Sequence, residues 1–367
     1  MLTTLLKPTQ AQLQKLLING ESADDVFTRM KPNKAGNLLL HDEEFARWLT
    51  YADDLKIKHP AIKTSAILTL TAHYGDDGLY KLIEAGLKNE GTETVATKLK
   101  TELMKHWVAT AKVPDKVFHI MKLDKVETDI LSNPEFINWA RYVDDFNAKY
   151  HKQSTSMVPT VLNYYSDDVI FKMTEAAKSV EETKAIATKL QEELVQAWLK
   201  SKKTPDEALV DFGLGKKTRY SKNPVEPLLE RALFNSWVKY LDDYNVLYPE
   251  KKTTVIEALT RRFGDANVAK MITKAKKEVV TRSLATKLEA AQLEIWLSSG
   301  KSVEDVFNLL KLDYAGVFFS EHHLINTLVS YMNVFIKENP SKAATVFSTV
   351  ETLLEGRPLG QILMLAA

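Results

Sequence analysis

Several features that would point to particular protein classes are missing from this 367-residue sequence. It contains no cysteine, which excludes disulfide bonds, Cys-ligated metal sites and thiol nucleophiles. Only 13 glycines and 12 prolines are present, so an all-β fold that needs many tight turns is disfavoured. No apolar run approaches the roughly 20 residues that span a bilayer. The formal net charge of +1 favours neither nucleic acid nor an anionic membrane as a partner.

The sequence contains instead an internal repeat. An eleven-residue stretch at 136–146 recurs at 45–55 and 234–244, with a degraded copy at 325–335. Its apolar residues fall at helical spacing, so each copy predicts a helix that buries one large side chain. That side chain, which we call the core tryptophan, is Trp48, Trp139 and Trp237 in turn, with Leu328 in the fourth copy. A period of this length indicates tandem copies of one structural unit.

Three further landmarks keep the same register. An aromatic residue follows each core tryptophan at a constant distance, at Tyr74, Tyr165 and Phe263, with Leu354 in the last copy. A second tryptophan precedes the later copies, at Trp107, Trp198 and Trp296, with Leu16 as the first counterpart. The tetrapeptide Ala-Thr-Lys-Leu recurs at 96–99, 187–190 and 285–288. We therefore predict an all-α fold, a linear array of four helical-bundle units at 1–91, 92–182, 183–280 and 281–367.

Each unit is predicted to contain about five helices. A capping signal opens the second helix at Ser22, Thr204 and Ser302. The helix of the core tryptophan is expected to stop near Pro60, Pro249 and Pro340, with a weaker stop in the second unit, where His151 takes that place. The last helix opens at Asp76-Asp77, Asp167-Asp168 or Asp265, which we predict to be N-caps. The third unit has a seven-residue insertion before its core tryptophan.

A unit of about 90 residues has only a small hydrophobic core. Paired aromatics on facing helices bury much apolar area for few residues. We therefore assign the core of each unit to the pairs Trp48 with Tyr74, Trp139 with Tyr165, and Trp237 with Phe263. The fourth unit replaces both members by leucine, as a terminal repeat that repacks would do.

Motifs that could carry chemistry are few. The paired carboxylates Asp53-Asp54, Asp144-Asp145 and Asp242-Asp243 could serve a metal or acid–base catalysis, but neighbours on a helix diverge, and a structural role is favoured. His322-His323 is disfavoured as a ligand pair for the same reason. No phosphate loop, nucleophile elbow or zincin motif is present. The insertion contributes Lys216, Lys217, Arg219 and Lys222, which form either a partner-binding loop or a solvated one. We expect no enzyme activity, cofactor or metal.

These residues together resemble the tandem WY and LWY repeats of oomycete RXLR-type effectors, which are plant-pathogen proteins. The resemblance covers nearly the whole chain. The three aromatic pairs correspond to the WY motif, and the L-type segments correspond to 103–123, 194–214 and 293–312. The resemblance implies a WY-type first unit followed by LWY units in an elongated, stick-like array. It also makes Trp107, Trp198 and Trp296 candidates for the joints between units. Because no Arg-x-Leu-Arg motif or secretory leader is present, we expect the mature part of an effector.

The resemblance also carries expectations about function. It implies a virulence protein that is secreted by the pathogen and translocated into the host cytoplasm or nucleus. There it would suppress immunity as a monomeric, non-enzymatic adaptor that binds host proteins, without a membrane partner. Some tandem LWY effectors bind the scaffold subunit of host protein phosphatase 2A through two adjacent units, displace a regulatory subunit and redirect the phosphatase. The alternative is a nucleic-acid-binding suppressor of RNA silencing, which would need a basic stripe that the balanced charge opposes.

Overall fold

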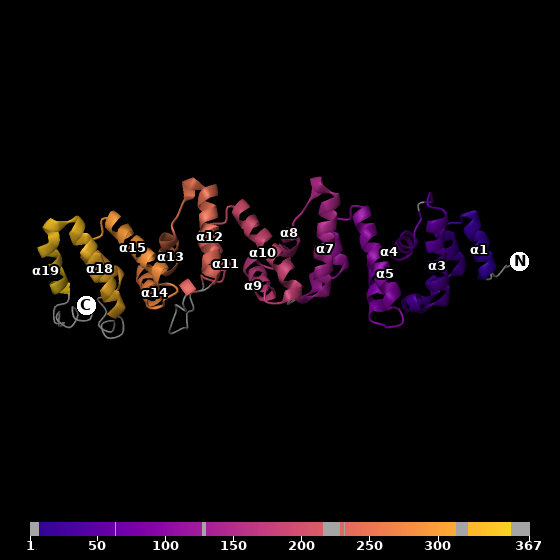
Figure 1. Ribbon diagram of the computed structural model, residues 1–367, viewed down its shortest axis with the longest axis horizontal. Coiled ribbons are helices and arrows are strands. Elements are labelled where there is room, and N and C mark those ends of the chain that lie inside the picture. Colours follow the sequence, from indigo (N-terminus) through magenta and orange to yellow (C-terminus); the bar gives the residue numbers. More distant parts are fainter. Residues whose placement is uncertain are drawn as a thin grey trace. The chain divides into compact units, whose positions relative to one another are not determined.

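The structure is a computed structural model that describes part of the chain. The ranges described are 7–62, 64–126, 130–215, 228–230, 232–312 and 322–353, without the side chains of 33–37, 230, 232, 322 and 323. Within these ranges every regular element is a helix, which confirms the predicted all-α fold (Figure 1). No helix in the described ranges combines the length and the apolar character that crossing a bilayer requires.

The helices follow the predicted repeat. The first repeat contains α1 (Gln10–Asn19), α2 (Ala23–Met30), η1 (Pro32–His41), α3 (Glu43–Lys58) and α4 (Ala66–Leu87). The second contains α5 (Glu93–Ala109), α6 (Pro114–Ile120), η2 (Leu123–Lys125), η3 (Ile130–Ser132), α7 (Pro134–Lys149), η4 (His151–Gln153), α8 (Val158–Leu162) and α9 (Asp167–Ala177). The third contains α10 (Glu181–Lys200), α11 (Pro205–Asp211), η5 (Leu228–Glu230), α12 (Ala232–Leu247), η6 (Pro249–Lys251), α13 (Val255–Phe263) and α14 (Asp265–Lys277). The fourth contains α15 (Arg282–Ser298), α16 (Val303–Leu309), α18 (His322–Glu338), η7 (Pro340–Lys342) and α19 (Ala343–Leu353).

Contacts group the chain into two compact units that do not coincide with whole repeats. The first compact unit consists of residues 1–165 and 176–190, and the second consists of 166–175 and 191–367. Helices α9 and α10 therefore contribute residues to both compact units. The boundaries of the four sequence repeats stay a prediction.

The core tryptophans occupy the same environment in three repeats. Trp48, Trp139 and Trp237 are completely buried. Each indole N–H donates to the carbonyl oxygen of the first residue of the second helix of its repeat, at 2.7 Å in the first repeat and 2.8 Å in the next two. Burial of the ring and a satisfied N–H together make this position the anchor of each bundle.

The helix of the core tryptophan ends at the same register in all four repeats. Helices α3, α12 and α18 end before a proline, as predicted, but α7 ends equally sharply without one, so the weaker stop predicted at His151 is wrong. Helix α7 ends there because the residue after the helix has non-helical backbone angles, as it does in each repeat. In the second repeat this is Tyr150 (φ −118°, ψ 60°), whose hydroxyl donates to the carbonyl oxygen of Val108 at 2.9 Å. Tyr248 does the same to Leu199 at 2.9 Å.

The predicted caps of the second helix are confirmed. The side chains of Ser22, Thr204 and Ser302 each accept a hydrogen bond from the backbone N–H of the residue three positions later. The N-caps predicted for the last helix are wrong. Asp167 and Asp265 are the first residues of α9 and α14, and Asp76 lies inside α4, which kinks at Gly75.

Glycine explains the kink in α4 and the displaced cap of α14, whereas in the second repeat Ser166 precedes Asp167. Gly75 has φ 66° and ψ 170°, and Gly264, which precedes α14, has φ 80° and ψ 156°. Residues with a Cβ rarely adopt these values. The glycines therefore turn the chain, and the aspartates that follow them are left free to bind other groups.

The fourth repeat keeps a core without the aromatic pair. Leu328 is 3% exposed and belongs to a cluster of buried apolar residues from α15, α16, α18 and α19. Tyr331 on α18 is completely buried in the same cluster. Leu354, the predicted counterpart of the tyrosines, lies outside the described residues.

Candidate functional site: the joints between repeats

The second tryptophan of each later repeat lies at a joint with the helix that ends the preceding repeat. Trp107, Trp198 and Trp296 are at most 2% exposed. Their indole N–H groups donate to the carboxylates of Asp76, Asp167 and Asp265 respectively. The third of these bonds measures 2.7 Å, and each pair is 31 residues apart in sequence. A buried indole N–H needs an acceptor, and a charged one binds it strongly.

A lysine completes the joint in two of the three cases. Lys112 Nζ lies 2.7 Å from Asp76 Oδ2, and Lys203 Nζ lies 2.9 Å from Asp167 Oδ2. Lys203 also contacts Asp211 Oδ2 at 2.6 Å. Burial alone would lower the pKa of Lys203, but the hydrogen bonds to Asp211 and Asp167 outweigh it and raise that pKa. The joint aspartate therefore accepts from two groups of the following repeat.

A tyrosine from the core-tryptophan helix closes each joint from the other side. The hydroxyls of Tyr240 and Tyr331 donate to the backbone carbonyls of Lys203 and Lys301 at 2.7 and 2.6 Å, and Tyr142 donates in the same way to Lys112. Each tyrosine ring meets the joint tryptophan edge-on, with centroids 5.9–6.5 Å apart. Burial raises the pKa of Tyr331 to about 12, so this hydroxyl stays a donor at neutral pH.

The first joint has a further polar cluster. Lys100 Nζ lies 3.0 Å from Glu84 Oε1 and 2.5 Å from Glu135 Oε1. Tyr80 donates its hydroxyl to Glu135, and its ring lies 6.0 Å from that of Trp107. Burial, together with the bond to Glu135, raises the pKa of Tyr80. Residues from α4, α5 and α7 thus share one network.

The paired carboxylates also contribute to the contacts between repeats. Asp53 pairs with Lys98, and Asp144 pairs with Lys189, where each lysine belongs to the Ala-Thr-Lys-Leu tetrapeptide of the following repeat. Asp243 lies 3.7 Å from Lys239 on its own helix. Among the described residues no group of three or more His, Cys, Asp or Glu could hold a metal ion. The side chains of His322 and His323 lie outside the described residues.

The aromatic partners predicted for the core tryptophans are only half-buried. The rings in contact with Trp48 are those of Phe27 and Phe45, with centroids 4.7 and 5.6 Å away. Trp139 has the equivalent contacts to Phe118 and Phe136, at 4.9 and 5.5 Å. Tyr165 donates its hydroxyl to the carbonyl of Val126, whereas the enclosed hydroxyl of Tyr74 has no hydrogen-bond partner among the described residues. The pairing of tryptophan with Tyr74, Tyr165 and Phe263 stays a prediction.

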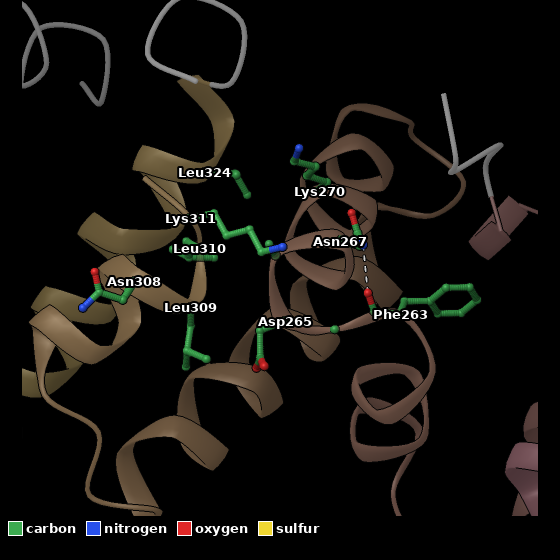
Figure 2. A pocket seen from close by; sticks show the side chains of 11 residues that line it. Phe263, Asp265, Asn267, Lys270, Asn308, Leu309, Leu310, Lys311 and Leu324 are labelled. Atoms are coloured by element: carbon green, nitrogen blue, oxygen red, sulfur yellow. Dashed lines mark hydrogen bonds between the residues drawn. The ribbon is translucent and has the colours of Figure 1, made fainter. Parts of the chain in front are cut away.

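A pocket of about 630 Å³ lies beside the third joint, between α14 and α16 (Figure 2). Lys311 reaches across it towards the start of α14, and Asn267 donates to the carbonyl of Phe263 at 2.8 Å. Asp265 and Lys270 lie on the α14 side. The predicted binding loop, with Lys216, Lys217, Arg219 and Lys222, lies outside the described residues.

Sequence reasoning singled out Trp107, Trp198 and Trp296, whose role as joints stays a prediction, but it missed the groups that bind them. These are the acceptors Asp76, Asp167 and Asp265, the lysines Lys112 and Lys203, and the tyrosines Tyr142, Tyr240 and Tyr331. A signal was available, because the aspartate precedes each tryptophan by the same 31 residues. It was assigned to helix capping instead.

Comparisons with known proteins agree with this architecture. A family model described as "Effector PexRD54, WY-domain" matches residues 102–143, which include the first joint tryptophan and the second core tryptophan. An "RxLR effector protein" of Phytophthora infestans is 36% identical over 347 residues, covering 92% of this chain and 50% of that protein. "RxLR effector protein PSR2" of Phytophthora sojae is 35% identical over 318 residues, covering 86% of this chain and 46% of the relative. The crystal structure of PcRxLR12 has a TM-score of 0.58 and 28% identity, covering 96% of this chain and 83% of that one.

The chain belongs to the oomycete RxLR effectors with WY domains. RxLR effectors are secreted and delivered into host cells. The chain spans about half the length of the curated relatives named above. The activity and the host partners of the whole effector are therefore proposals.

Proposed function

We propose that this effector acts inside the plant cell as a non-enzymatic adaptor that binds host proteins and suppresses immunity. The observation that carries the proposal is the repeated joint of tryptophan, aspartate and tyrosine. The polar groups of this joint form hydrogen bonds that connect one repeat to the next. The proposal therefore gives them a structural rather than a catalytic role. Joints of this kind turn small bundles into larger binding surfaces, which is how repeat proteins engage partners.

The partner that we propose is the scaffold subunit of host protein phosphatase 2A. The support is the resemblance to tandem LWY effectors that use two adjacent units for this purpose. In such a complex one pair of repeats would displace a regulatory subunit, and the remaining repeats would recruit the proteins to be dephosphorylated. Two neighbouring repeats can present one surface only if the joint between them is stiff, and the hydrogen bonds from Trp107 and Lys112 to Asp76 support such a joint.

The test is affinity capture of the tagged chain from plant cells, followed by mass spectrometry. The scaffold subunit should be recovered with the full chain and lost when the repeats that bind it are deleted, one repeat at a time. Deleting the other repeats should leave the scaffold subunit bound but remove additional host proteins. Recovery of no phosphatase subunit would refute this partner. Short duplex RNA found by sequencing the nucleic acid of the same capture would favour a suppressor of RNA silencing.

A further inference from the structure

In successive repeats the second helix packs against the helix that follows the core-tryptophan helix, α2 against α4, α6 against α8 and α11 against α13. In the third repeat an arginine joins these two helices. Arg261 on α13 donates two hydrogen bonds to Asp206 on α11, from Nε to Oδ1 at 3.1 Å and from Nη2 to Oδ2 at 2.8 Å. The same Nη2 also donates to the hydroxyl of Thr253 at 2.8 Å. A planar guanidinium suits this arrangement because it presents parallel donors to a carboxylate.

In the first repeat a histidine contacts the aspartate instead. His73 Nε2 lies 3.0 Å from Oδ1 of Asp24, the residue at the position of Asp206. The ring of His73 also lies against that of Phe27, with centroids 4.7 Å apart. In both repeats a side chain of the chain itself therefore binds the aspartate.

The second repeat keeps the aspartate and the threonine but lacks the arginine. Asp115 and Thr155 stand where the third repeat has Asp206 and Thr253, and Asn163 stands in place of Arg261. A pocket of about 390 Å³, which we call the groove of the second repeat, opens there. Its lining includes Val113, Pro114, Asp115, Phe146, Thr155 and Asn163. The nearest basic side chain to Asp115 among the described residues is His119, whose Nε2 lies 4.0 Å from Oδ2.

The backbone of Thr155, one acceptor of this pocket, is held in place before any ligand arrives. Asn147 Nδ2 donates to the carbonyl of Thr155 at 2.7 Å and Asn147 Oδ1 accepts from its N–H at 2.9 Å. Asn245 and Thr253 make the same two bonds in the third repeat, at 2.7 and 2.9 Å. Thr155 is thus fixed in the same way as Thr253, the residue that helps to bind Arg261, although the second repeat has no arginine at that position.

We propose that the groove of the second repeat binds an arginine side chain of a protein partner, in the place that Arg261 fills in the third. The guanidinium donates to the carboxylate of Asp115 and to the hydroxyl of Thr155. Its aliphatic stem packs against Pro114 and Phe146, since long cationic side chains lay their methylene groups on apolar surface. This assignment rests on the proposed role as a protein-binding adaptor and adds the chemistry of one contact.

The test uses a minimal probe, N-acetyl-arginine-N-methylamide, titrated into the full chain while methyl and amide NMR signals are recorded. We expect shifts confined to the signals of Val113, Asp115, Thr155 and Asn163. The isosteric citrulline compound, which lacks the charge, should bind at least about ten-fold more weakly, which is the factor that 1.4 kcal/mol represents. Equal shifts with citrulline, a preference for the lysine compound, or no localised shift would each overturn the proposal.

Three variants separate binding from misfolding. Asn163→Arg should fill the groove from within and abolish binding of the probe, whereas Asn163→Ala should leave it intact. Arg261→Asn should open the groove of the third repeat and create a second site, with new shifts at Asp206 and Thr253. Probe binding that survives Asn163→Arg in a folded chain would contradict the assignment. Because the probe is not a host protein, failure here leaves the capture experiment for the adaptor function untouched.

Discussion

At the scale of single residues, the two repeated tryptophans use the same atom for different purposes. The core indoles donate to a backbone carbonyl of their own repeat, as Trp139 does to Pro114 at 2.8 Å. The joint indoles donate to a carboxylate of the preceding repeat, as Trp296 does to Asp265 at 2.7 Å. Hydrogen bonds to an ionised acceptor are roughly twice as strong as neutral ones. The core position thus contributes mainly through packing, and the joint position contributes packing together with a specific charged bond.

The first prediction concerns the core position. Trp139→Ala should lower the free energy of unfolding by about 3–5 kcal/mol, because it removes a fully buried ring and leaves a cavity between Phe118 and Phe136. Chemical denaturation of the full chain measures the change. Trp139→Phe should cost less, since it keeps part of the ring but loses the N–H that satisfies Pro114. A melting curve that Trp139→Ala leaves unchanged would refute the assignment of this residue to the core.

The second prediction concerns the joint. Asp76→Ala should destabilise the chain by about 1–3 kcal/mol, because the buried N–H of Trp107 and the ammonium of Lys112 both lose their acceptor. The neighbouring exposed Asp77 provides a matched control, and Asp77→Ala should stay within about 0.5 kcal/mol of the parent. Denaturation of both variants decides the matter. Equal effects of the two substitutions would mean that the joint bond contributes nothing specific.

The sequence could predict some of these contacts and not others. Helical spacing was enough to predict that Trp48, Trp139 and Trp237 are buried, since one face of a helix must meet the core. The acceptor of Trp107 was not predictable in the same way, because Asp76 belongs to another repeat and meets the indole only after the repeats pack. An aspartate after glycine at the start of a helix is more often a cap, and that local preference outweighed the long-range pairing.

At the scale of helices, the ends are fixed by side chains that reach across the bundle. Proline explained the ends of α3, α12 and α18 but not that of α7, where Tyr150 bonds to the end of α5. Sequence reasoning could predict the capping boxes, because they form within three residues, as between Thr204 and Glu207. It could not predict an end that depends on a carbonyl 42 residues away.

The third prediction concerns the cap of α11. The N–H and hydroxyl of Thr204 donate to Glu207 and lower the pKa of its carboxyl below the usual 4.5. A group whose folded pKa is depressed adds stability that is present above its unfolded pKa and lost as pH falls through the folded pKa. Glu207→Gln should therefore reduce the loss of stability on acidification below about pH 4.5. Denaturation at a series of pH values measures this slope, with Glu192→Gln on exposed surface as the control for loss of one charge.

At the scale of the whole molecule, the contacts divide the chain differently from the sequence. The repeat places residues 166–175 with the core of the second repeat, but contacts place them in the second compact unit. The physical reason lies in the second joint. Asp167 binds Trp198 and Lys203, and Phe171 lies 4.6 Å from Phe212 by ring centroid, so the start of α9 packs with the repeat that follows it. A period in the sequence identifies the unit that was copied, whereas contacts identify the unit that packs together.

The last prediction tests this division by amide hydrogen exchange. Sub-global openings expose contiguous cooperative units, so damage to one core should speed exchange mainly in its own unit. Trp139→Ala should raise exchange in α7 and α8, while peptides that cover 166–175 keep their protection. Trp237→Ala should do the reverse and release 166–175 together with α12, because their contacts belong to the same compact unit. If 166–175 instead followed α7 in both variants, the sequence repeat, rather than the contact-defined unit, would be the cooperative element of this effector.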